Sequence, residues 1–476
     1  MSSDPLDPEV RRIIDQARRA DELRARYAID MKMTFSSPGS RPDDLGNVCP
    51  ICRARTPTSA RYADYVCEPC TERAEDENGA RIVFGNADLF GGVVARVDGE
   101  KRQVTTCRIG GRECVVNEAR FGGVVYSAAG LRVASQDPSR HGNRLAERVA
   151  GAVLGAAIGD ALGHPTEFVQ SFDDLRSRFG PLGVQGFATF REEAGRRFAP
   201  YTDDTQLAEL VLVSLLDARR AGEDLERAMT RLAAAIVRWS TSPQGGHRAP
   251  GRACLSGAAR LAAGEHWSRA GAEDAGGSGS VMRAYPVGLV FHSDWSLREE
   301  WAVAQSTLTH RAPIALAASS AMAHATASAL AGDAVSDTVR ALVEHAARHD
   351  AVTAEMIAGA AASALAGEEP EPVLGRLKGW AAHEAIAAAT YVYVRHADDF
   401  RSAVLEAANT PGDSDTIATL VGALVGARCG TNAIAADWLR DVERGAELRM
   451  LAARTLAESG YTDWDDVLAQ LGAIGS

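Results

Sequence analysis

Alanine-rich stretches with helical character dominate the sequence from residue 144 to about residue 470, and they constrain the fold more than any other feature. "APIALAASSAMAHATASALAG" and "GWAAHEAIAAATYVYV" are two examples. Alanine has the highest intrinsic helix propensity, and its small side chain lets neighbouring helices approach closely. No repeat of fixed length is visible, which argues against a solenoid. The sequence therefore predicts a mainly α protein in which residues 144–470 form a compact all-α helical bundle.

A stripe of glycines opens this helical region. In "GAVLGAAIGDALGHPTEF", glycine recurs at every fourth position from Gly151 to Gly163. This spacing places the glycines on one helix face, and we interpret most of the stripe as a surface for tight helix packing. Asp160 and Glu167 are exceptions, because we expect a carboxylate near the end of such a buried helix to face a cleft.

The first 140 residues have a different character. Residues 1–46 contain an amphipathic pattern at 7–29, which predicts a helix, followed by a linker rich in Pro, Gly and Ser. Residues 47–75 hold two cysteine pairs. Residues 80–138 contain β-branched runs interrupted by Gly and Asp-Gly, which is typical of short strands and hairpins. We therefore expect a zinc ribbon and a small β-rich segment before the helical bundle.

The two cysteine pairs have the spacing C-x2-C-x14-C-x2-C, with members Cys49, Cys52, Cys67 and Cys70. Two thiolate pairs on tight turns supply tetrahedral sulfur ligands to Zn²⁺. Four sulfurs leave no open coordination position, so the predicted role of this zinc is structural. The alternative is four unrelated buried cysteines. Cys107 and Cys114 lack this spacing, and we interpret them as core residues.

Two clusters of acidic and hydroxyl residues stand where apolar helix patterns begin. Their members are Thr202, Asp203 and Asp204 in "YTDDTQLAEL", and Asp413, Asp415 and Thr416 in "GDSDTIATL". One carboxylate at a helix N-terminus is commonly a cap that also interacts favourably with the helix dipole. A cap needs one Asp, whereas each cluster has two acids and a Thr. Such hard oxygen groups suit Mg²⁺ or Mn²⁺, so we predict that the two helix starts meet around divalent metal ions.

Two weaker features lie between the acidic clusters. "GGSGSVMR" is a glycine-rich loop, and such loops expose backbone N–H groups to phosphate oxygens. It lacks the Gly-Lys-Ser/Thr ending of a Walker A motif. His310 stands just before a helix that begins with Pro, and a single histidine is more often structural than functional.

Composition limits the location and the partners. The formal net charge of −12 argues against a nucleic-acid-binding surface across the whole molecule but leaves a local basic patch open. No uninterrupted apolar run reaches the roughly 18 residues that span a bilayer, and the charged N-terminus has no signal-peptide core. We therefore expect a cytoplasmic protein that is not associated with a membrane.

The motifs, taken in order, resemble those of a known family. "GAAIGDALGHPTEF", "YTDDTQLAELV", "GSGSVMRAYPVGL", "THRAPIALAASSAMAHA" and "GDSDTIATLVGALVGA" are similar to motifs of the ADP-ribosylglycohydrolase family, which includes the dinitrogenase reductase-activating glycohydrolase and the ADP-ribosyl-arginine and ADP-ribosyl-serine hydrolases. The resemblance covers about residues 145 to 460. It implies an all-α domain with a binuclear Mg²⁺ or Mn²⁺ site.

The resemblance also implies roles for individual residues. The metal ligands would be Thr202, Asp203, Asp204, Asp413, Asp415 and Thr416. Glu167 would be the acidic residue beside the metals, with catalytic work shared among Glu167, Asp203, Asp204 and Asp415. The diphosphate of ADP-ribose would lie on the loop formed by Gly276, Gly277, Ser278, Gly279 and Ser280, with His310 near the substrate.

The implied activity is metal-dependent removal of ADP-ribose from a modified protein side chain, with an arginine-type N-glycosidic linkage favoured. One alternative is hydrolysis of a serine-linked, nucleic-acid-linked or metabolite-linked derivative. Another is an adaptor that binds ADP-ribose without cleaving it. We expect the N-terminal 140 residues to dock or target the enzyme, for example onto an ADP-ribosylating toxin. Two Mg²⁺ or Mn²⁺ ions and one Zn²⁺ are the expected cofactors.

Overall fold

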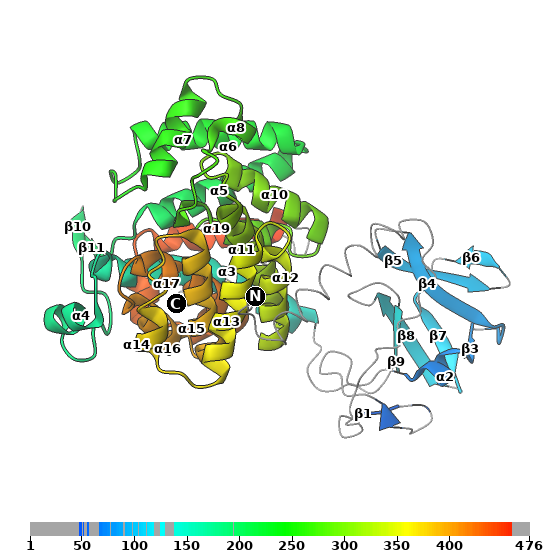
Figure 1. The fold of residues 1–476 in the computed structure, drawn as a ribbon. Coiled ribbons are helices and arrows are strands. Elements are labelled where there is room, and N and C mark those ends of the chain that lie inside the picture. Colours follow the sequence, from blue (N-terminus) through cyan, green and yellow to red (C-terminus); the bar gives the residue numbers. More distant parts are fainter. Residues whose placement is uncertain are drawn as a thin grey trace, which may run out of the picture. The chain divides into compact units, whose positions relative to one another are not determined.

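The computed structural model describes residues 47–128, with short gaps, and residues 138–458 except residue 194. The gaps fall at 50, 52–54, 57–65, 77, 89–90, 98, 103, 111 and 119–123. The described residues belong to two compact units that divide between residues 140 and 141 (Figure 1). The helix and linker predicted within residues 1–46, and Cys52, lie outside the described residues.

The N-terminal unit is built from short antiparallel strands, as the β-branched runs of its sequence predict. Its elements are β1 (Asn47–Val48), β2 (Arg55–Thr56), α2 (Glu68–Thr71), β3 (Ala74–Glu75), β4 (Ile82–Asp88), β5 (Gly91–Val97), β6 (Glu100–Arg102), β7 (Thr106–Ile109), β8 (Arg112–Glu118) and β9 (Val124–Ala128). β1 and β2 form a hairpin, β4, β5 and β6 form one sheet in that order, and β3, β7, β8 and β9 form another.

The core of this unit lies between its sheets and the α2 turn. Ile82, Phe84 and Ile109 are among its buried side chains. Cys107 on β7 is paired directly with Cys114 on β8, and both are buried in this core. This placement agrees with their interpretation as core residues.

The C-terminal unit is helical apart from one small hairpin. Its elements are α3 (Pro138–Gly163), η2 (His164–Thr166), α4 (Phe172–Phe179), β10 (Arg191–Glu193), β11 (Arg196–Phe198), α5 (Asp203–Ala221), α6 (Leu225–Thr241), α7 (Arg252–Ala262), α8 (Trp267–Ala270), η3 (Ser278–Ser280), α9 (Tyr285–Val290), α10 (Trp295–Thr307), α11 (Pro313–Ala331), α12 (Val335–Ala346), α13 (Ala351–Leu365), α14 (Pro370–Leu374), α15 (Ala382–His396), α16 (Phe400–Ala408), α17 (Ser414–Cys429), η4 (Thr431–Ala433), α18 (Ala436–Asp441) and α19 (Gly445–Glu458). The prediction of a mainly α protein with an all-α bundle is confirmed.

Helices α11, α15 and α17 pack on one another in the middle of this unit (Figure 1). The glycine stripe of α3 lies against α17: a Cβ on Gly155 would stand 2.4 Å from the Gly422 carbonyl oxygen, and one on Gly159 would stand 2.0 Å from that of Ala418. No other residue type fits such a backbone approach. This contact fixes the start of α17 beside the end of α3.

Helix α11 is the one described helix that is long and apolar enough to cross a membrane by length and composition. Of its most apolar window, 83% is buried inside the protein. That degree of burial is typical of a core helix, and it follows from the alanine-rich sequence that packs against α9, α10 and α17.

Candidate functional site

The two acidic clusters lie together, because the first turns of α5 and α17 are in contact. The Thr416 hydroxyl donates to Oδ1 of Asp204 at 2.9 Å, although the two residues are 212 positions apart. Thr202 is the N-cap of α5, and its hydroxyl oxygen accepts the Asp204 N–H at 3.3 Å. The structure therefore brings carboxylate and hydroxyl oxygens of both helix starts into one buried site.

The Asp413 end of the site is held by two backbone segments. The Asp413 N–H donates to the carbonyl oxygen of Lys378 at 2.7 Å, and the turn before it pairs with Phe168 and Val169 through Gly412. The Ser278 hydroxyl donates to Oδ2 of Asp413 at 2.7 Å. The glycine-rich loop, predicted only as a phosphate cradle, therefore contacts the acidic site directly.

Glu167 follows η2 and faces the same site. Ligand atoms of Glu167, Asp415 and His164 lie within 4.8 Å of one another. His164 was not predicted as a site residue, although the His-Pro step that follows the glycine-striped helix is a usable signal. Its Nδ1 is buried without a hydrogen-bond partner among the described residues, and burial lowers the pKa of the ring.

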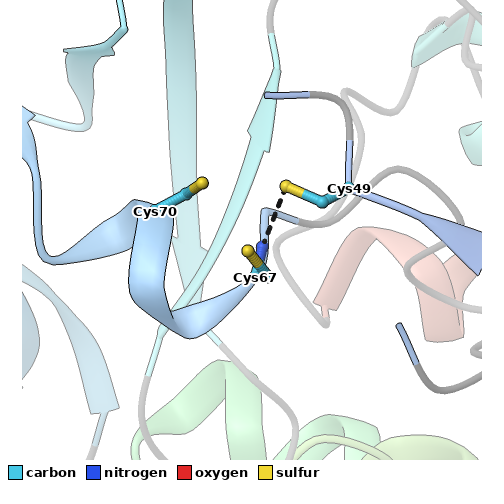
Figure 2. Close-up of side chains that lie close together, drawn as sticks. All are labelled: Cys49, Cys67 and Cys70. Atoms are coloured by element: carbon cyan, nitrogen blue, oxygen red, sulfur yellow. Dashed lines mark hydrogen bonds between the residues drawn. The ribbon is translucent and has the colours of Figure 1, made fainter. Parts of the chain in front are cut away.

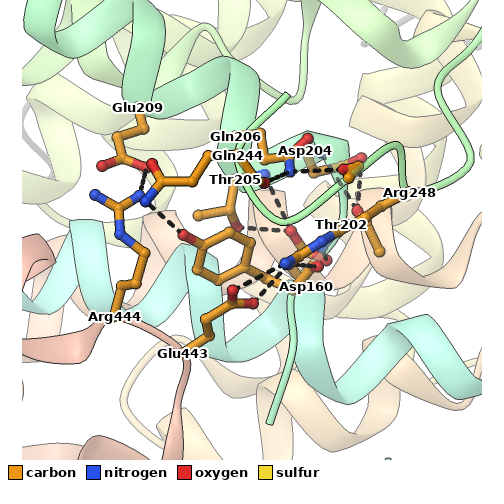
Figure 3. A network of polar contacts seen from close by, with 12 residues as sticks. Asp160, Thr202, Asp204, Thr205, Gln206, Glu209, Gln244, Arg248, Glu443 and Arg444 are labelled. Atoms are coloured by element: carbon orange, nitrogen blue, oxygen red, sulfur yellow. Dashed lines mark hydrogen bonds and ion pairs between the residues drawn. The ribbon is translucent and has the colours of Figure 1, made fainter. Parts of the chain in front are cut away.

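Asp160 serves a different purpose from the one expected. Its carboxylate accepts the Thr202 N–H at 2.8 Å, the Thr205 N–H at 3.0 Å and the Thr205 hydroxyl at 2.6 Å (Figure 3). The first N–H groups of a helix have no partner within the helix. Asp160 supplies that partner for α5, so it positions the cluster rather than facing an open cleft.

A buried ion pair holds the backbone segment that leads into α5. Arg248 donates from Nη1 to the Tyr201 carbonyl oxygen at 2.6 Å, and from Nη2 to Glu443 at 2.8 Å (Figure 3). Because Tyr201 directly precedes the N-cap, this contact holds the backbone that presents the first cluster.

Protein cations compensate little of the charge of the site: the buried Arg283 guanidinium favours ionisation of Asp203, but burial and the neighbouring carboxylates outweigh it. Asp203, Asp204, Asp413 and Asp415 are each at most 5% exposed, and none of them forms an ion pair within the described ranges. Burial, followed by the charges of neighbouring carboxylates, raises the pKa of Asp203 to about 8 and the pKa values of Asp204 and Asp415 well above the usual range. The same causes raise the pKa of Glu167 to about 8.

Such a cluster fits divalent cations. Several carboxylates without a counter-charge are costly to bury, and Mg²⁺ and Mn²⁺ are bound by carboxylate and hydroxyl oxygens of this kind. The donors that converge here are all oxygen atoms apart from His164, so the residues present fit hard metal ions better than soft ones.

The glycine-rich loop lies between the acidic cluster and His310. Ser278 N–H donates to the Trp380 carbonyl oxygen at 3.3 Å, and the Gly276 carbonyl oxygen accepts the Ala382 N–H at 2.9 Å. A Cβ on Gly279 would stand 2.9 Å from Cε1 of His310. The loop is therefore held against the His310 ring on one side, while Ser278 reaches Asp413 on the other.

Three of the four predicted zinc ligands also lie together. Sulfur atoms of Cys49, Cys67 and Cys70 are within 4.8 Å of one another and point towards a common centre (Figure 2). Cys67 is the N-cap of α2, its N–H donates to the Cys49 sulfur at 3.4 Å, and Cys70 lies one turn later. Thiolates arranged in this way are soft donors that suit Zn²⁺.

A third cluster was not predicted from the sequence. Ligand atoms of Glu299 on α10, His324 on α11 and His345 on α12 lie within 4.8 Å of one another. Arg298 donates from Nε to Nδ1 of His324 at 3.0 Å, so the neutral ring carries its proton on Nε2, 3.0 Å from Glu299. Metal binding would need that nitrogen without its proton. We interpret this cluster as a polar clamp between three helices.

Comparison with known proteins gives three findings. The family model for ADP-ribosylglycohydrolase matches residues 141–465. An uncharacterized protein of Archaeoglobus fulgidus is 27% identical over 256 residues, which cover 53% of this chain and 79% of that protein. A solved structure titled "ADP-ribosylglycohydrolase-related protein complex" is 26% identical, with a TM-score of 0.48, and covers 66% of this chain and 99% of its own.

Proposed function

The chain belongs to the ADP-ribosylglycohydrolase family and is a hydrolase of ADP-ribosyl linkages, and we propose that it removes ADP-ribose from modified arginine side chains of proteins. The observation that carries this proposal is the buried meeting of two acidic helix starts beside a glycine-rich loop, linked by Thr416 to Asp204 and by Ser278 to Asp413. We favour the arginine linkage among those that the family resemblance allows.

Two divalent cations complete the proposed site. Their ligands would be Thr202, Asp203, Asp204, Asp413, Asp415 and Thr416. When bound, such ions supply charge compensation and Lewis acidity. We propose Mg²⁺ or Mn²⁺, because both prefer the oxygen donors present here.

The residues of the chain have separate tasks in the reaction. Water adds to C1″ of the distal ribose while the bond from C1″ to the guanidinium nitrogen breaks. The charge that develops on the sugar is oxocarbenium-like, and the surrounding carboxylates stabilise it. Glu167, which is outside the proposed ligand set, accepts a proton from the attacking water and returns it to the leaving nitrogen. Burial and the neighbouring carboxylates raise the pKa of Glu167 to about 8 in the cation-free protein. Bound cations would lower it, so that the ionised carboxylate can accept the proton.

The direct test is a panel of linkages. ADP-ribosyl-arginine, ADP-ribosyl-serine and a metabolite-linked ADP-ribose are each assayed with Mg²⁺, with Mn²⁺ and with a chelator. We expect release from the arginine linkage that depends on the added metal. Release from the serine linkage alone would replace the arginine assignment, and tight ADP-ribose binding without any release would favour the adaptor alternative.

The matched variant for this panel is Asp415→Ala. Asp415 is 2% exposed and lies within the carboxylate cluster. We expect its loss to lower turnover by at least about 100-fold while far-UV circular dichroism retains the helical signal. A variant that works at the parental rate would contradict the proposed site.

For the N-terminal unit, we propose a structural Zn²⁺ held by Cys49, Cys52, Cys67 and Cys70, and a role in docking protein substrates or partners. The support is the convergence of three sulfur atoms in a small unit separate from the helical one. A chain lacking the first 137 residues should lose turnover on modified protein but keep it on free ADP-ribosyl-arginine. Equal losses on both substrates would count against docking.

A further inference from the structure

His164 brings a nitrogen donor to a cluster whose other donors are oxygen atoms. Its Nδ1 is buried and has no hydrogen-bond partner in the part of the chain that the structure describes. This atom lies 4.0 Å from Oε2 of Glu167, and a ring nitrogen of His164 lies within 4.8 Å of carboxylate oxygens of both Glu167 and Asp415. Buried polar atoms without a partner are rare in folded proteins. One that lies among carboxylates points to a bound ion.

The backbone holds the His164 ring beside Asp415. His164 begins η2 and directly follows Gly163, the last residue of α3. A Cβ on Gly163 would stand 2.5 Å from Cα of Asp415 and 2.6 Å from its backbone nitrogen. Only glycine permits this approach of two backbones. The residue that follows Gly163 is therefore fixed next to the first turn of α17.

Two buried hydroxyl groups hold the η2 turn on this part of the protein. The Ser414 hydroxyl donates to the Gly163 carbonyl oxygen at 3.0 Å. The Thr166 hydroxyl oxygen lies 2.5 Å from the Ala408 carbonyl oxygen and 3.0 Å from Oγ of Ser414. The His164 ring is thus carried by a turn whose position does not depend on the ring itself, as is typical of a preorganised ligand.

An ion pair with Glu167 is the simpler explanation for this ring. The 4.0 Å between Nδ1 and Oε2 is too long for a hydrogen bond, however. Burial, followed by the positive charges of Arg191 and Arg248, lowers the pKa of His164, which favours the neutral ring near pH 7. A neutral imidazole with its proton on Nε2 has a free lone pair on Nδ1, and this is the form that binds a metal ion.

An imidazole nitrogen changes which cation a carboxylate site prefers. Mg²⁺ prefers oxygen ligands and loses its water reluctantly. Transition-metal ions accept imidazole nitrogen more readily, and among them Mn²⁺ also suits a site made mainly of carboxylates. We propose that Nδ1 of His164 joins Asp415 as a ligand of one cation, and that this nitrogen makes the site select Mn²⁺ over Mg²⁺.

This inference rests on the cation site of the proposed function, but it does not depend on which ADP-ribosyl linkage is hydrolysed. Glu167 remains outside the ligand set and keeps its role in proton transfer. His164 is a ligand in this arrangement and takes no part in moving protons. Its loss should therefore change which cation binds, and this can be measured without any turnover.

The nitrogen ligand is tested with Mn²⁺ as the probe. Substoichiometric Mn²⁺ is added to the full chain, and electron spin echo envelope modulation detects imidazole nitrogen bound directly to the ion. We expect a ¹⁴N coupling that becomes a ¹⁵N coupling after histidine-selective ¹⁵N labelling. The coupling should be lost in His164→Asn. It should be retained in His247→Asn, which changes an exposed histidine whose Nε2 lies 3.0 Å from the Ser240 carbonyl oxygen.

The selection between cations is tested by titration calorimetry with Mn²⁺ and with Mg²⁺. We expect the parental protein to bind Mn²⁺ more tightly. His164→Ala removes the donor and should weaken Mn²⁺ binding by at least the roughly 10-fold that loss of an outer-shell partner of a metal site costs, with little change for Mg²⁺. His164→Asn places an amide oxygen near the position of Nδ1, so it should lower the affinity for Mn²⁺ while Mg²⁺ still binds. Circular dichroism at 222 nm checks that both variants are folded.

The outcomes separate this inference from the proposed function. Mn²⁺ that binds without a histidine coupling, or a coupling that survives in His164→Asn, would overturn the nitrogen ligand. Equal weakening of Mn²⁺ and Mg²⁺ binding in His164→Ala would overturn the selection. A parental protein that binds neither ion would overturn the proposed cation site together with this inference. A histidine coupling in a protein that hydrolyses no ADP-ribosyl linkage would overturn the proposed activity alone.

Discussion

Replacing Asp203 by Asn should stabilise the metal-free protein at alkaline pH, although most substitutions of buried polar residues destabilise. The Asp203 side chain is buried, and burial together with the charge of Asp160 raises its pKa from 3.8 to about 8. The folded state therefore holds this proton more tightly than the unfolded state does. The free energy of unfolding must fall as the pH rises from about 4 to about 8, and it is not reduced by this group below pH 4.

The size of the effect follows from the two pKa values. A pKa of 3.8 in the unfolded state and of about 8 in the folded state corresponds to about 5 kcal/mol at pH 8. When Asp203 ionises, neighbouring carboxylates take up protons, and this lowers the cost of its charge. We therefore expect Asp203→Asn to raise the free energy of unfolding at pH 8 by about 2 kcal/mol. For the C-terminal helical unit, which has about 320 described residues, the entropy of unfolding is about 0.7 kcal/mol/K. The midpoint of thermal unfolding should therefore rise by about 3 °C.

The assay is thermal unfolding followed by circular dichroism at 222 nm, in chelator, at pH 5 and pH 8. We expect Asp203→Asn to unfold at a higher temperature than the parental protein at pH 8, and at nearly the same temperature at pH 5. Excess Mg²⁺ should reverse the order, because a ligand at 100 times its Kd adds about 2.7 kcal/mol to the parental protein and less to a variant that lacks one proposed ligand.

The matched control is Asp160→Asn, which removes a neighbouring negative charge. Asp160 accepts N–H groups of both Thr202 and Thr205, so its replacement should destabilise by about 1–3 kcal/mol at both pH values. If Asp203→Asn also destabilised the chelated protein equally at pH 5 and pH 8, the argument from poorly compensated buried charge would be refuted.

Three further predictions concern other parts of the molecule. Gly159→Ala should lower the free energy of unfolding by about 3 kcal/mol or more in urea titrations, because its Cβ would stand 2.0 Å from the Ala418 carbonyl oxygen. The control Gly359→Ala, in an open helix position, should raise it by about 1 kcal/mol. Equal effects of the two substitutions would contradict the close approach of α3 and α17. Burial opposes ionisation of Glu299, but its contacts with three histidines outweigh burial and hold its pKa well below 4.5. Glu299→Gln should therefore lower the free energy of unfolding by about 2–4 kcal/mol at pH 7, and by less as the pH falls below about 4.5. A decrease that does not change with pH would contradict the interpretation of this cluster as a clamp. Cys70→Ser should reduce bound zinc, measured by mass spectrometry of the native protein, from one per chain to none, and retention of zinc would contradict the ligand set.

Much of this protein was readable from its sequence because the signals are local. Alanine-rich helical patterns, cysteine pairs on tight turns and a four-residue glycine repeat each report the geometry of neighbouring residues. Paired acids at two helix starts exceeded what capping requires, which singled them out before any fold was known. Family motifs then added residue-by-residue expectations that periodicity alone does not supply.

What the sequence left open depends on contacts between distant segments. Only the tertiary structure brings Thr416 to Asp204 across 212 residues. Only it shows that Asp160 accepts hydrogen bonds from the start of α5 and does not face an open cleft. The hydrogen bonds that link Arg283 to Thr309 and Thr309 to His310 likewise have no sequence signature, because they depend on which hydroxyl a buried guanidinium reaches. Local patterns determine which groups are available; packing of the helices determines which of them meet, since the direction of a hydrogen bond is set only when both partners are in place.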